Sequence, residues 1–297
     1  MSTPGRNLLI TGVSGFLGRH LCRAACDAWR VTGSFLEHEC EIPGVALRRA
    51  DLGERNAVRR LLDATAPAAV IHAAGATRLD ACEQKPAESR RANVDATRWL
   101  AEECVRRGVG LVYVSTDQVF DGEHAPYDEA APPSPVNEYG RQKAAAEAVV
   151  RDLCGARGLV CRLPLLFGRA DPGAANFLAT HVKALRARQT LRLFTDEFRT
   201  PVSATVAAEG ILLTLVRGGR GVFHLGGLER VSRWQLGMLV AEVAGLDAAP
   251  IVAARRSEGA LSAPRPADVS LVSARASTLG FRPPPLREQL AAALSGL

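Results

Sequence analysis

Short apolar runs alternate with longer helix-forming stretches from residue 7 to about residue 165. The runs, rich in β-branched residues and Leu, lie at 8–11, 31–35, 70–73, 111–115 and 159–163. The stretches between them are rich in Ala, Leu and Arg and predict helices at 16–28, 56–65, 88–107 and 139–154. Strands that alternate with helices are typical of strand–helix–strand units. We therefore predict an α/β fold with a doubly wound parallel sheet.

The pattern becomes looser after residue 168. We expect a helix near 176–187, a short strand near 222–225, a helix near 234–245 and a last amphipathic stretch at 286–294. Residues 260–285 are rich in Pro, Ser and Arg. We expect residues 1–165 to form the core of the sheet. Residues 166–297 are expected to form mainly a smaller lobe over it, with room for segments that return to the sheet.

Composition and charge narrow the classes of function. The chain has 297 residues, 47% hydrophobic and 23% charged, which is ordinary for a globular protein. Its net charge is +6, from 37 Lys and Arg against 31 Asp and Glu, but the basic residues form short, separate pairs. Binding to a phosphate backbone requires clustered cations. We therefore expect no nucleic-acid partner, and a positive field that favours small anions such as nucleotides.

Cysteine usage and the length of apolar runs bear on location. The seven Cys residues have no C-x-x-C spacing and their number is odd, so they predict neither a metal site nor a closed disulfide framework. The longest apolar runs, such as 211–216, are far shorter than the ~18 residues of a membrane span. Residues 1–7 lack a secretory pattern. We expect a cytoplasmic protein without membrane contact.

A glycine-rich turn follows the first predicted strand. Gly12, Gly15 and Gly18 form a G-x-x-G-x-x-G pattern between that strand and the next helix. Glycines let the backbone turn tightly and approach a pyrophosphate, and the start of the helix supplies amide donors. The pattern alone also fits a plain tight turn, but the strand before it and the helix after it favour a Rossmann-like dinucleotide site.

The end of the second predicted strand bears on the choice of cofactor. No Asp or Glu stands there to bind the ribose 2′-hydroxyl of NAD, since Ser34 offers a hydroxyl and the first acid, Glu37, comes late. We therefore expect NADPH, with NADH as the alternative. Asp51 and Leu52, after a third strand region, are placed to contact the adenine, although an Asp at a helix start is equally a cap.

Tyr139 and Lys143 lie four residues apart on one face of a predicted helix. An ammonium close to a phenol favours the phenolate and lowers the pKa of the Tyr toward working pH. Such a pair can serve as general acid or base at a carbonyl. The structural alternative is a Tyr packed at a helix start beside an exposed Lys.

Hydroxyl side chains stand at the ends of two predicted strands. Ser115 and Thr116 close one strand, and Thr77 follows another. Ligands of open α/β sheets bind beyond the carboxyl ends of strands, so we expect these hydroxyls to meet the glycine turn in one crevice. Thr77 is equally a turn cap. Asn93, inside a predicted helix, is either a polar support or an exposed residue.

These motifs resemble those of the extended short-chain dehydrogenases/reductases and, within them, the dTDP-4-dehydrorhamnose reductase (RmlD-like) family. The resemblance spans nearly the whole chain, and its most specific part is the Val-Phe-Asp-Gly block at 119–122. The other matching segments lie at 11–18, 72–77, 115–118, 126–127, 137–143 and 265–268. The resemblance implies a Rossmann-like sheet with a smaller C-terminal substrate-binding lobe. It also implies reduction of the C4 ketone of a nucleotide-linked 4-keto-6-deoxy sugar by hydride from a nicotinamide.

The resemblance further implies roles for individual residues. Tyr139 would protonate the nascent alkoxide, and Thr116 would hydrogen-bond the same oxygen with support from Ser115. Lys143 would bind the nicotinamide ribose and lower the pKa of Tyr139. The cofactor-binding residues would be Gly12, Ser14, Gly15, Phe16, Leu17, Gly18, Ser34, Asp51, Leu52, Ala73, Ala74, Gly75, Thr77, Ser115, Tyr139, Lys143 and Pro164. The substrate-binding residues would be Thr77, Thr116, Gln118, Asn176, Phe177 and Arg199. The forked donors of an Arg suit a diphosphate.

Position 118 departs from the pattern of the family. Gln118 stands where rhamnose-type reductases usually carry a Tyr that lines the sugar site, so the identity of the sugar stays open. The sugar-nucleotide 4,6-dehydratases have Thr-Asp-Glu here and use the acid pair to eliminate water. Because Gln118 replaces that Glu, we do not expect a dehydratase.

A second class of function remains open. The regulatory β-subunit of methionine adenosyltransferase closely resembles this family, keeps nucleotide-binding features and works as a binding partner rather than primarily as an enzyme. The motifs do not separate the two classes, but the presence of Thr116, Tyr139 and Lys143 together favours catalysis. A homodimer, sometimes linked by Mg²⁺, also belongs to the family's properties, although no cluster of metal ligands in this sequence requires the ion.

Overall fold

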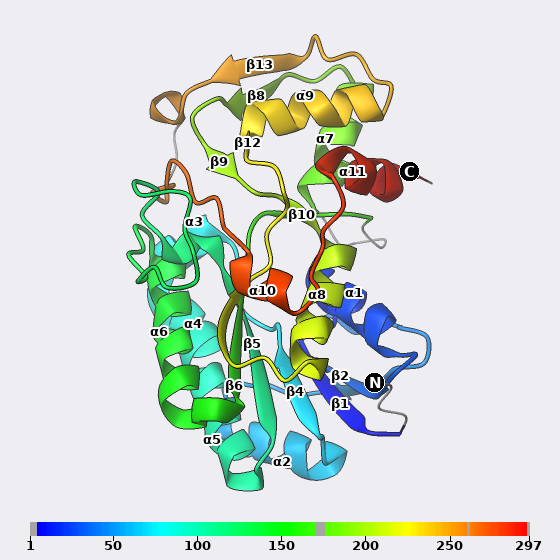
Figure 1. The fold of residues 1–297 in the computed structure, drawn as a ribbon, viewed down its shortest axis with the longest axis vertical. Coiled ribbons are helices and arrows are strands. Elements are labelled where there is room, and N and C mark those ends of the chain that lie inside the picture. Colours follow the sequence, from blue (N-terminus) through cyan, green and yellow to red (C-terminus); the bar gives the residue numbers. More distant parts are fainter. Residues whose placement is uncertain (1–4, 170–175, 260–261, 296–297) are drawn as a thin grey trace.

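A parallel sheet of seven strands forms the lower half of the molecule in Figure 1. The computed structural model describes residues 5–169, 176–259 and 262–295. Within them the strand order of the sheet is β11-β6-β5-β4-β1-β2-β3, and every neighbouring pair is parallel. The strands are β1 (Asn7–Thr11), β2 (Arg30–Phe35), β3 (Ala46–Arg49), β4 (Ala69–His72), β5 (Gly110–Thr116), β6 (Gly158–Leu163) and β11 (Gly221–His224).

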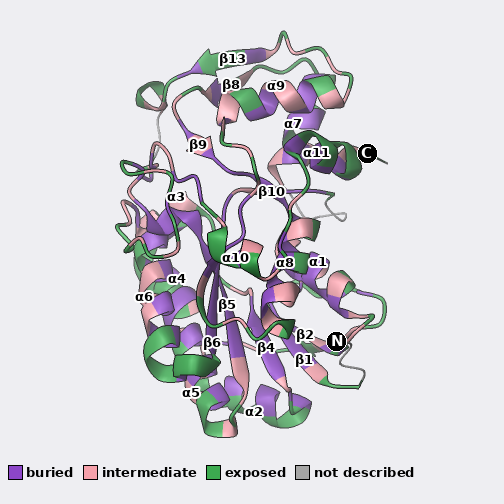
Figure 2. Ribbon diagram, in the orientation of Figure 1, coloured by how far each residue is buried: buried purple, intermediate pink, exposed green. Residues whose placement is uncertain are grey.

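Helices cover both faces of this sheet, which explains why its central strands are buried along their whole length (Figure 2). On one face α1 (Phe16–Ala25) and α8 (Ala204–Val216) pack on β1 in one apolar cluster. On the other face α2 (Arg55–Thr65), α5 (Ala96–Arg107) and α6 (Glu138–Cys154) pack in a second. The predicted fold class is confirmed.

The strand order reverses between β1 and β4. The chain runs from β1 outward to β2 and β3, and then returns to pair β4 with the other side of β1, with Thr11 beside His72. In open α/β sheets such a reversal leaves a crevice beyond the carboxyl ends of the strands. The glycine turn after β1 and residues 73–77 after β4 lie at this point.

A smaller lobe lies beyond the carboxyl ends of the strands, at the top of Figure 1. Its helices α7 (Phe177–Arg186), α9 (Arg233–Val243) and α11 (Leu286–Leu294) share one apolar cluster. Three short strand pairs complete it: β8 (Leu191–Phe194) with β13 (Ile251–Ala254), β9 (Phe198–Arg199) with β12 (Val231–Ser232), and β7 (Leu166–Phe167) with β10 (Val202–Ser203). Strand β11, the helix α8 and the short α10 (Ala274–Thr278) return from this half of the chain to the sheet.

The expected strands and helices of the first half are present, with bounds shifted by a few residues. Several features were not predicted or were given no bounds. The strand region expected before Asp51 is the edge strand β3, which reads Ala-Leu-Arg-Arg and is largely exposed, so no apolar run marks its bounds. The short strand pairs of the smaller lobe and α10 were not predicted. The helix α8 was not recognised. The predicted helix at 88–107 begins as α4 (Pro86–Arg90), passes through one π-helical turn (Arg91–Asp95) and continues as α5, while the short α3 (Leu79–Gln84) precedes it. None of the described helices combines the length and the apolar character needed to cross a membrane.

Candidate functional site

A cavity of about 800 Å³ lies between the sheet and the smaller lobe. The residues that follow β1, β4 and β5 line it, where the strand order reverses. It extends from residues 34–38, at the end of β2, past the glycine turn to Arg233 and Arg265. Among the described residues, all of the site residues expected from the sequence line this cavity except Asn176 and Phe177.

The glycine turn presents bare backbone to the cavity. Gly12 has φ of +74°, and a Cβ atom there would lie 2.7 Å from the backbone of Ala74 at the end of β4. A Cβ atom on Gly18 would lie 2.2 Å from the carbonyl oxygen of Gly12. Helix α1 begins after Gly15, whose lack of a side chain leaves the first helical amides available to an anion. These residues therefore fit the pyrophosphate of a dinucleotide.

The end of β2 lies beside two arginines that the sequence analysis did not assign. Ser34 is buried, and its carbonyl oxygen accepts hydrogen bonds from the amides of the glycine turn. In the sheet Ser34 pairs with Arg48 and Phe35 pairs with Arg49 of β3. Nε of Arg49 donates to the carbonyl oxygen of Leu36 at 3.0 Å. The sequence predicted a strand region before Asp51 but gave no role to Arg48 or Arg49, and neither of them is among the described residues that line the cavity.

Asp51 lines the cavity with Leu52, but its carboxylate already has partners. Oδ1 accepts a hydrogen bond from the amide of Gly53 at 2.9 Å, and Oδ2 lies 2.7 Å from Nη2 of Arg91. The carboxylate thus stabilises the turn before α2, but it does not cap that helix, which begins after Glu54 without a side-chain cap. The expected contact with adenine stays a prediction.

Thr116 and Tyr139 meet on one wall of the cavity. Thr116 ends β5, and Tyr139 lies in the first turn of α6, which Asn137 caps by accepting the amide of Gly140 at 2.8 Å. The pKa of the Tyr139 phenol is raised, first by burial and then by the Asp117 carboxylate, while its hydrogen bond with Thr116 opposes the rise. Tyr139 is therefore protonated at neutral pH, as a proton donor must be.

Lys143 lies deeper in the same wall, and one expectation about it needs correction. Its Nζ donates to the carbonyl oxygen of Val114 at 2.6 Å and lies 4.1 Å from the ring centre of Tyr113. Burial lowers the pKa of Lys143 to about 7, and Glu147 opposes this shift. The ammonium is thus directed at Val114 and Tyr113, and it does not lower the pKa of Tyr139 as the spacing suggested.

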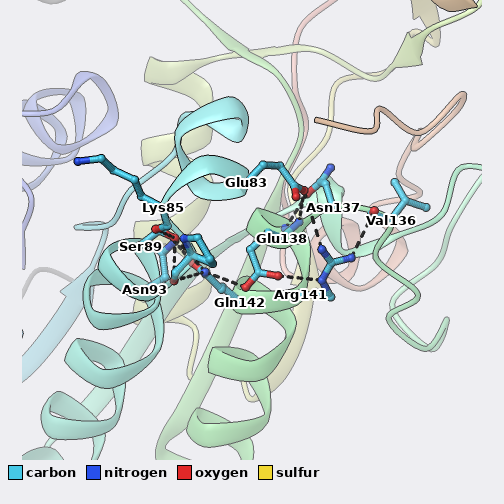
Figure 3. Close-up of polar contacts among 11 residues, drawn as sticks. Glu83, Lys85, Ser89, Asn93, Val136, Asn137, Glu138, Arg141 and Gln142 are labelled. Carbon is cyan, nitrogen blue, oxygen red and sulfur yellow. Dashed lines mark hydrogen bonds and ion pairs between the residues drawn. The ribbon is translucent and has the colours of Figure 1, made fainter. Parts of the chain in front are cut away.

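Asn93 stabilises the loop after β4 through hydrogen bonds to its backbone. Its Oδ1 accepts the amide of Ala76 at 2.8 Å, and its Nδ2 donates to the carbonyl oxygen of Ala76 at 3.0 Å and to Oε1 of Gln142 at 2.9 Å. Gln142 in turn donates to Ser89 and Glu138, so the network connects α4, the π-helical turn and α6 (Figure 3). Of the two interpretations of Asn93, the structure shows the polar support.

A buried histidine connects the same loop to the glycine turn. The ring nitrogens of His72 lie 2.7 Å from Oγ1 of Thr11 and 3.2 Å from Oγ1 of Thr97. Thr11 also accepts the amide of Ala74 at 3.3 Å. Burial, with a smaller contribution from Lys143, lowers the pKa of His72 to about 3. A neutral imidazole therefore lies beneath the glycine-turn end of the cavity.

Three arginines line the opposite end of the cavity, in the smaller lobe: Arg199, Arg233 and Arg265. Nε of Arg199 lies 3.4 Å from Asp117 and its Nη2 lies 3.3 Å from Glu197. Burial lowers the pKa of Arg233 to about 10, so its guanidinium is still charged at neutral pH. Nε of Arg265 is buried without a hydrogen-bond partner among the described residues. Only Arg199 was a sequence candidate, because nothing in the pattern near residues 233 and 265 shows that they reach this cavity.

Asn176 and Phe177 have other roles in the structure than the expected contact with the sugar. Asn176 caps α7, since its Oδ1 accepts the amide of Ala179 at 2.9 Å and its Nδ2 donates to the carbonyl oxygen of Gly168 at 2.8 Å. The ring of Phe177 packs against Phe167, His181 and the guanidinium of Arg233. Their proposed contact with substrate stays a prediction without support from the cavity lining.

The Val-Phe-Asp-Gly block at 119–122 builds a joint and does not line the cavity within the described chain. The hydroxyl of Tyr127 accepts the amides of residues 122–124 at 2.9 to 3.0 Å and donates to Asp121. Gly122 has φ of +88°, and a Cβ atom there would lie 2.6 Å from the backbone of Ala267. The block therefore fixes the segment that follows Arg265, whose Asp268 amide also donates to the carbonyl oxygen of Gly122 at 3.3 Å.

Comparison with known proteins places this geometry in a family. The model of the family described as RmlD substrate binding domain matches residues 6–297. The dTDP-4-keto-6-deoxy-D-glucose reductase of Streptomyces niveus is 34% identical over 219 residues, 73% of this chain and 71% of that protein. The methionine adenosyltransferase 2 subunit beta of Bos taurus is 29% identical over 295 residues, 95% of this chain and 84% of that protein.

A solved structure shows the same fold. The dTDP-4-dehydrorhamnose reductase of Bacillus anthracis in complex with NADP superposes with a TM-score of 0.85 at 22% identity, and the match covers 100% of both chains.

Proposed function

The chain belongs to the RmlD substrate binding domain family, and from this premise we propose that it is an NADPH-dependent reductase of a nucleotide-activated 4-keto-6-deoxy sugar. One observation carries the proposal. A single cavity contains a glycine cradle at one end, Thr116 and Tyr139 in the middle and three arginines at the other end. The Streptomyces niveus relative, a dTDP-4-keto-6-deoxy-D-glucose reductase, supports the substrate class, and the Bacillus anthracis reductase in complex with NADP supports the cofactor.

The chain's own residues would move the proton. NADPH, when bound, supplies the hydride. Tyr139 holds a proton on Oη at neutral pH, because burial and Asp117 raise its pKa, and gives it to the carbonyl oxygen as charge develops there. The Thr116 hydroxyl, which donates to Asp117 Oδ1 at 3.1 Å in the structure, can rotate to donate to the same oxygen. Lys143 would hold the nicotinamide ribose.

The two ends of the cavity would bind the two phosphate-bearing ligands. The glycine turn binds the pyrophosphate of NADPH, and Arg49 of β3, whose Nε donates to the carbonyl oxygen of the cavity-lining Leu36, would bind its 2′-phosphate. This arrangement favours NADPH over NADH. Arg199, Arg233 and Arg265 would bind the diphosphate of the sugar nucleotide through their forked donors.

The test is the loss of NADPH absorbance with dTDP-4-keto-6-deoxyglucose generated in place, with NADH in parallel. We expect turnover with NADPH, weaker turnover with NADH and loss of most turnover in Tyr139→Phe. NADPH binding without turnover of any 4-keto sugar would contradict the proposal.

A second candidate is a binding role like that suggested by the methionine adenosyltransferase relative, favoured by the match over 95% of this chain. It needs no buried phenol beside Thr116, and this is why we rank it second. Capture of a methionine adenosyltransferase by the purified chain, with no sugar turnover, would reverse the order. A homodimer and a cytoplasmic location stay predictions.

A further inference from the structure

We propose that Glu147 is a positioning residue for the reduction, which keeps the side chain of Lys143 charged so that it can hold the nicotinamide ribose. The inference deepens the proposed function and rests on it, because that function gives Lys143 a ribose to hold. Glu147 lies in α6 four residues after Lys143 and eight after Tyr139, so the three side chains share one face of the helix. All three are buried.

Donors from two strands fix the Glu147 carboxylate. Ser115, which lines the cavity at the end of β5, donates its hydroxyl hydrogen to Oε1. Arg162 of β6, the sheet partner of Ser115, donates from Nε to Oε1 at 3.0 Å and from Nη2 to Oε2 at 2.7 Å. Such bidentate pairing stabilises the negative charge and fixes its direction. His224 of β11 lies beside Arg162 and is neutral at neutral pH, because burial and then Arg162 lower its pKa to about 3, so the charge of the arginine is paired by Glu147.

The other surroundings of Lys143 do not favour a charge. Its Nζ lies over the ring of Tyr113 and donates to the carbonyl oxygen of Val114. Three of the titratable groups around it are uncharged at neutral pH: His72 of β4, Tyr113 of β5 and Tyr139 of its own helix. Burial therefore acts on an ammonium whose nearest partners are a carbonyl group and an aromatic ring.

Glu147 supplies the opposing charge. Burial lowers the pKa of Lys143 to about 7, and the Glu147 carboxylate opposes this shift. An ammonium has three hydrogen-bond donors, so after the bond to Val114 two remain for the ribose hydroxyls. Without Glu147 the side chain would be a neutral amine over most of the working pH range.

The charge of Lys143 can be measured directly by NMR. The chain has three lysines, Lys85, Lys143 and Lys183, so labelling with [ε-¹³C]lysine gives three signals, which Lys85→Arg and Lys183→Arg assign. Lys85 and Lys183 are exposed and serve as internal references. We expect the wild-type Lys143 signal to titrate with a pKa of about 7, and the signal in Glu147→Gln to titrate at least about one pH unit lower.

A second variant covers the case in which Glu147→Gln does not fold, since it leaves Arg162 buried without its carboxylate. Glu147→Gln combined with Arg162→Gln removes both charges at similar volume and should lower the Lys143 titration in the same way. Glu103→Gln is the matched control, because Glu103 is also buried and pairs with two arginines, on α5. It should reduce stability and leave the Lys143 titration unchanged.

The pH profile of kcat/KM for NADPH connects this charge to the reaction. Lys143 loses its proton as pH rises through its pKa, so the alkaline fall of kcat/KM should begin at lower pH in the double variant. A pKa lower by one pH unit predicts a loss of about tenfold at pH 8 that shrinks to about twofold at pH 6.

The outcomes separate the inference from the proposed function. A Lys143 titration in the double variant equal to that of the wild type, or a lowered titration with an unshifted pH profile, would overturn the inference and leave the reductase standing. A lowered titration together with no sugar turnover by the wild type would overturn the reductase, while the effect of Glu147 on the charge of Lys143 would stand.

Discussion

The two ends of the cavity are built in different ways. The cofactor end is made of backbone: one continuous turn, 12–18, and the loop 73–77, supported by the uncharged side chains of Asn93 and His72. The substrate end is made of charged side chains, Asp117, Glu197 and the three arginines, which come from distant parts of the chain. A backbone site depends on local geometry that few residues can adopt. A side-chain site depends on which segments the fold brings together, so its specificity can change while the fold is kept.

The largest effect is expected at Tyr139, where the two ends meet. Tyr139→Phe removes the proton donor but keeps the ring that packs in the wall, so kcat should fall by about 10²- to 10⁴-fold. The Kd of NADPH should change little, because the glycine cradle is untouched. Stopped-flow hydride transfer and NADPH fluorescence titration check both parts, and a Phe variant with undiminished kcat would remove Tyr139 from the acid role.

Adding one methyl group at Gly12 should disturb the cofactor end, because this end is made of closely packed backbone. In Gly12→Ala the Cβ atom would lie 2.7 Å from the backbone of Ala74 at a φ of +74°. We expect the Kd of NADPH to rise at least tenfold and the free energy of unfolding to fall by about 1–3 kcal/mol. Gly108→Ala is the matched control, since it has φ of +69° and its Cβ atom meets nothing within 4 Å. It should lose stability but bind NADPH normally; equal NADPH affinity in both variants would refute the cradle.

Removing one cation from the substrate end should weaken the binding of the sugar nucleotide and leave the binding of NADPH unchanged. Arg265→Gln removes one of the three guanidinium groups that line the cavity, and we expect the KM of the sugar nucleotide to rise about tenfold. The KM of NADPH should stay constant. Arg151→Gln, on an exposed side chain paired with Asp152, is the control. A rise in the NADPH KM instead would mean that Arg265 serves the other end.

The smallest effect concerns the free energy of unfolding, which should depend on pH because His72 is buried in its neutral form. The pKa of His72 falls from 6.5 to about 3 on folding, so between these values the unfolded chain binds more protons than the folded one. The free energy of unfolding should therefore decrease as pH falls through this window, by up to about 1.4 kcal/mol per pH unit from this residue. Urea unfolding at pH 7.5, 6 and 5 measures the slope. His72→Gln should flatten it, whereas His124→Gln, at a side chain that is 75% exposed, should leave it unchanged.

Much of the cofactor end could be predicted from the sequence, because its signals are local. A strand, three glycines and a helix within 19 residues specify a turn that only glycine can make, and Tyr139 and Lys143 share one helical face by spacing alone. The prediction for Lys143 was wrong in one respect. Its spacing placed it near Tyr139, but only the sheet decides that the ammonium meets Val114 and Tyr113.

Most residues of the substrate end could not be predicted from the sequence, for a physical reason. Arg233 and Arg265 enter the cavity because the strand pair β9–β12 and the joint at Gly122 bring their segments there, and side chains that meet across more than a hundred residues have no common spacing. The bounds of the edge strand β3, with its two arginines, were not predicted because an exposed strand needs no apolar run. By itself the sequence therefore determined the fold class and the positions of the glycine turn and of Tyr139, whose signals lie within single turns. Only the tertiary structure decided which charged side chains line the other end of the cavity, since long-range packing brings their segments together.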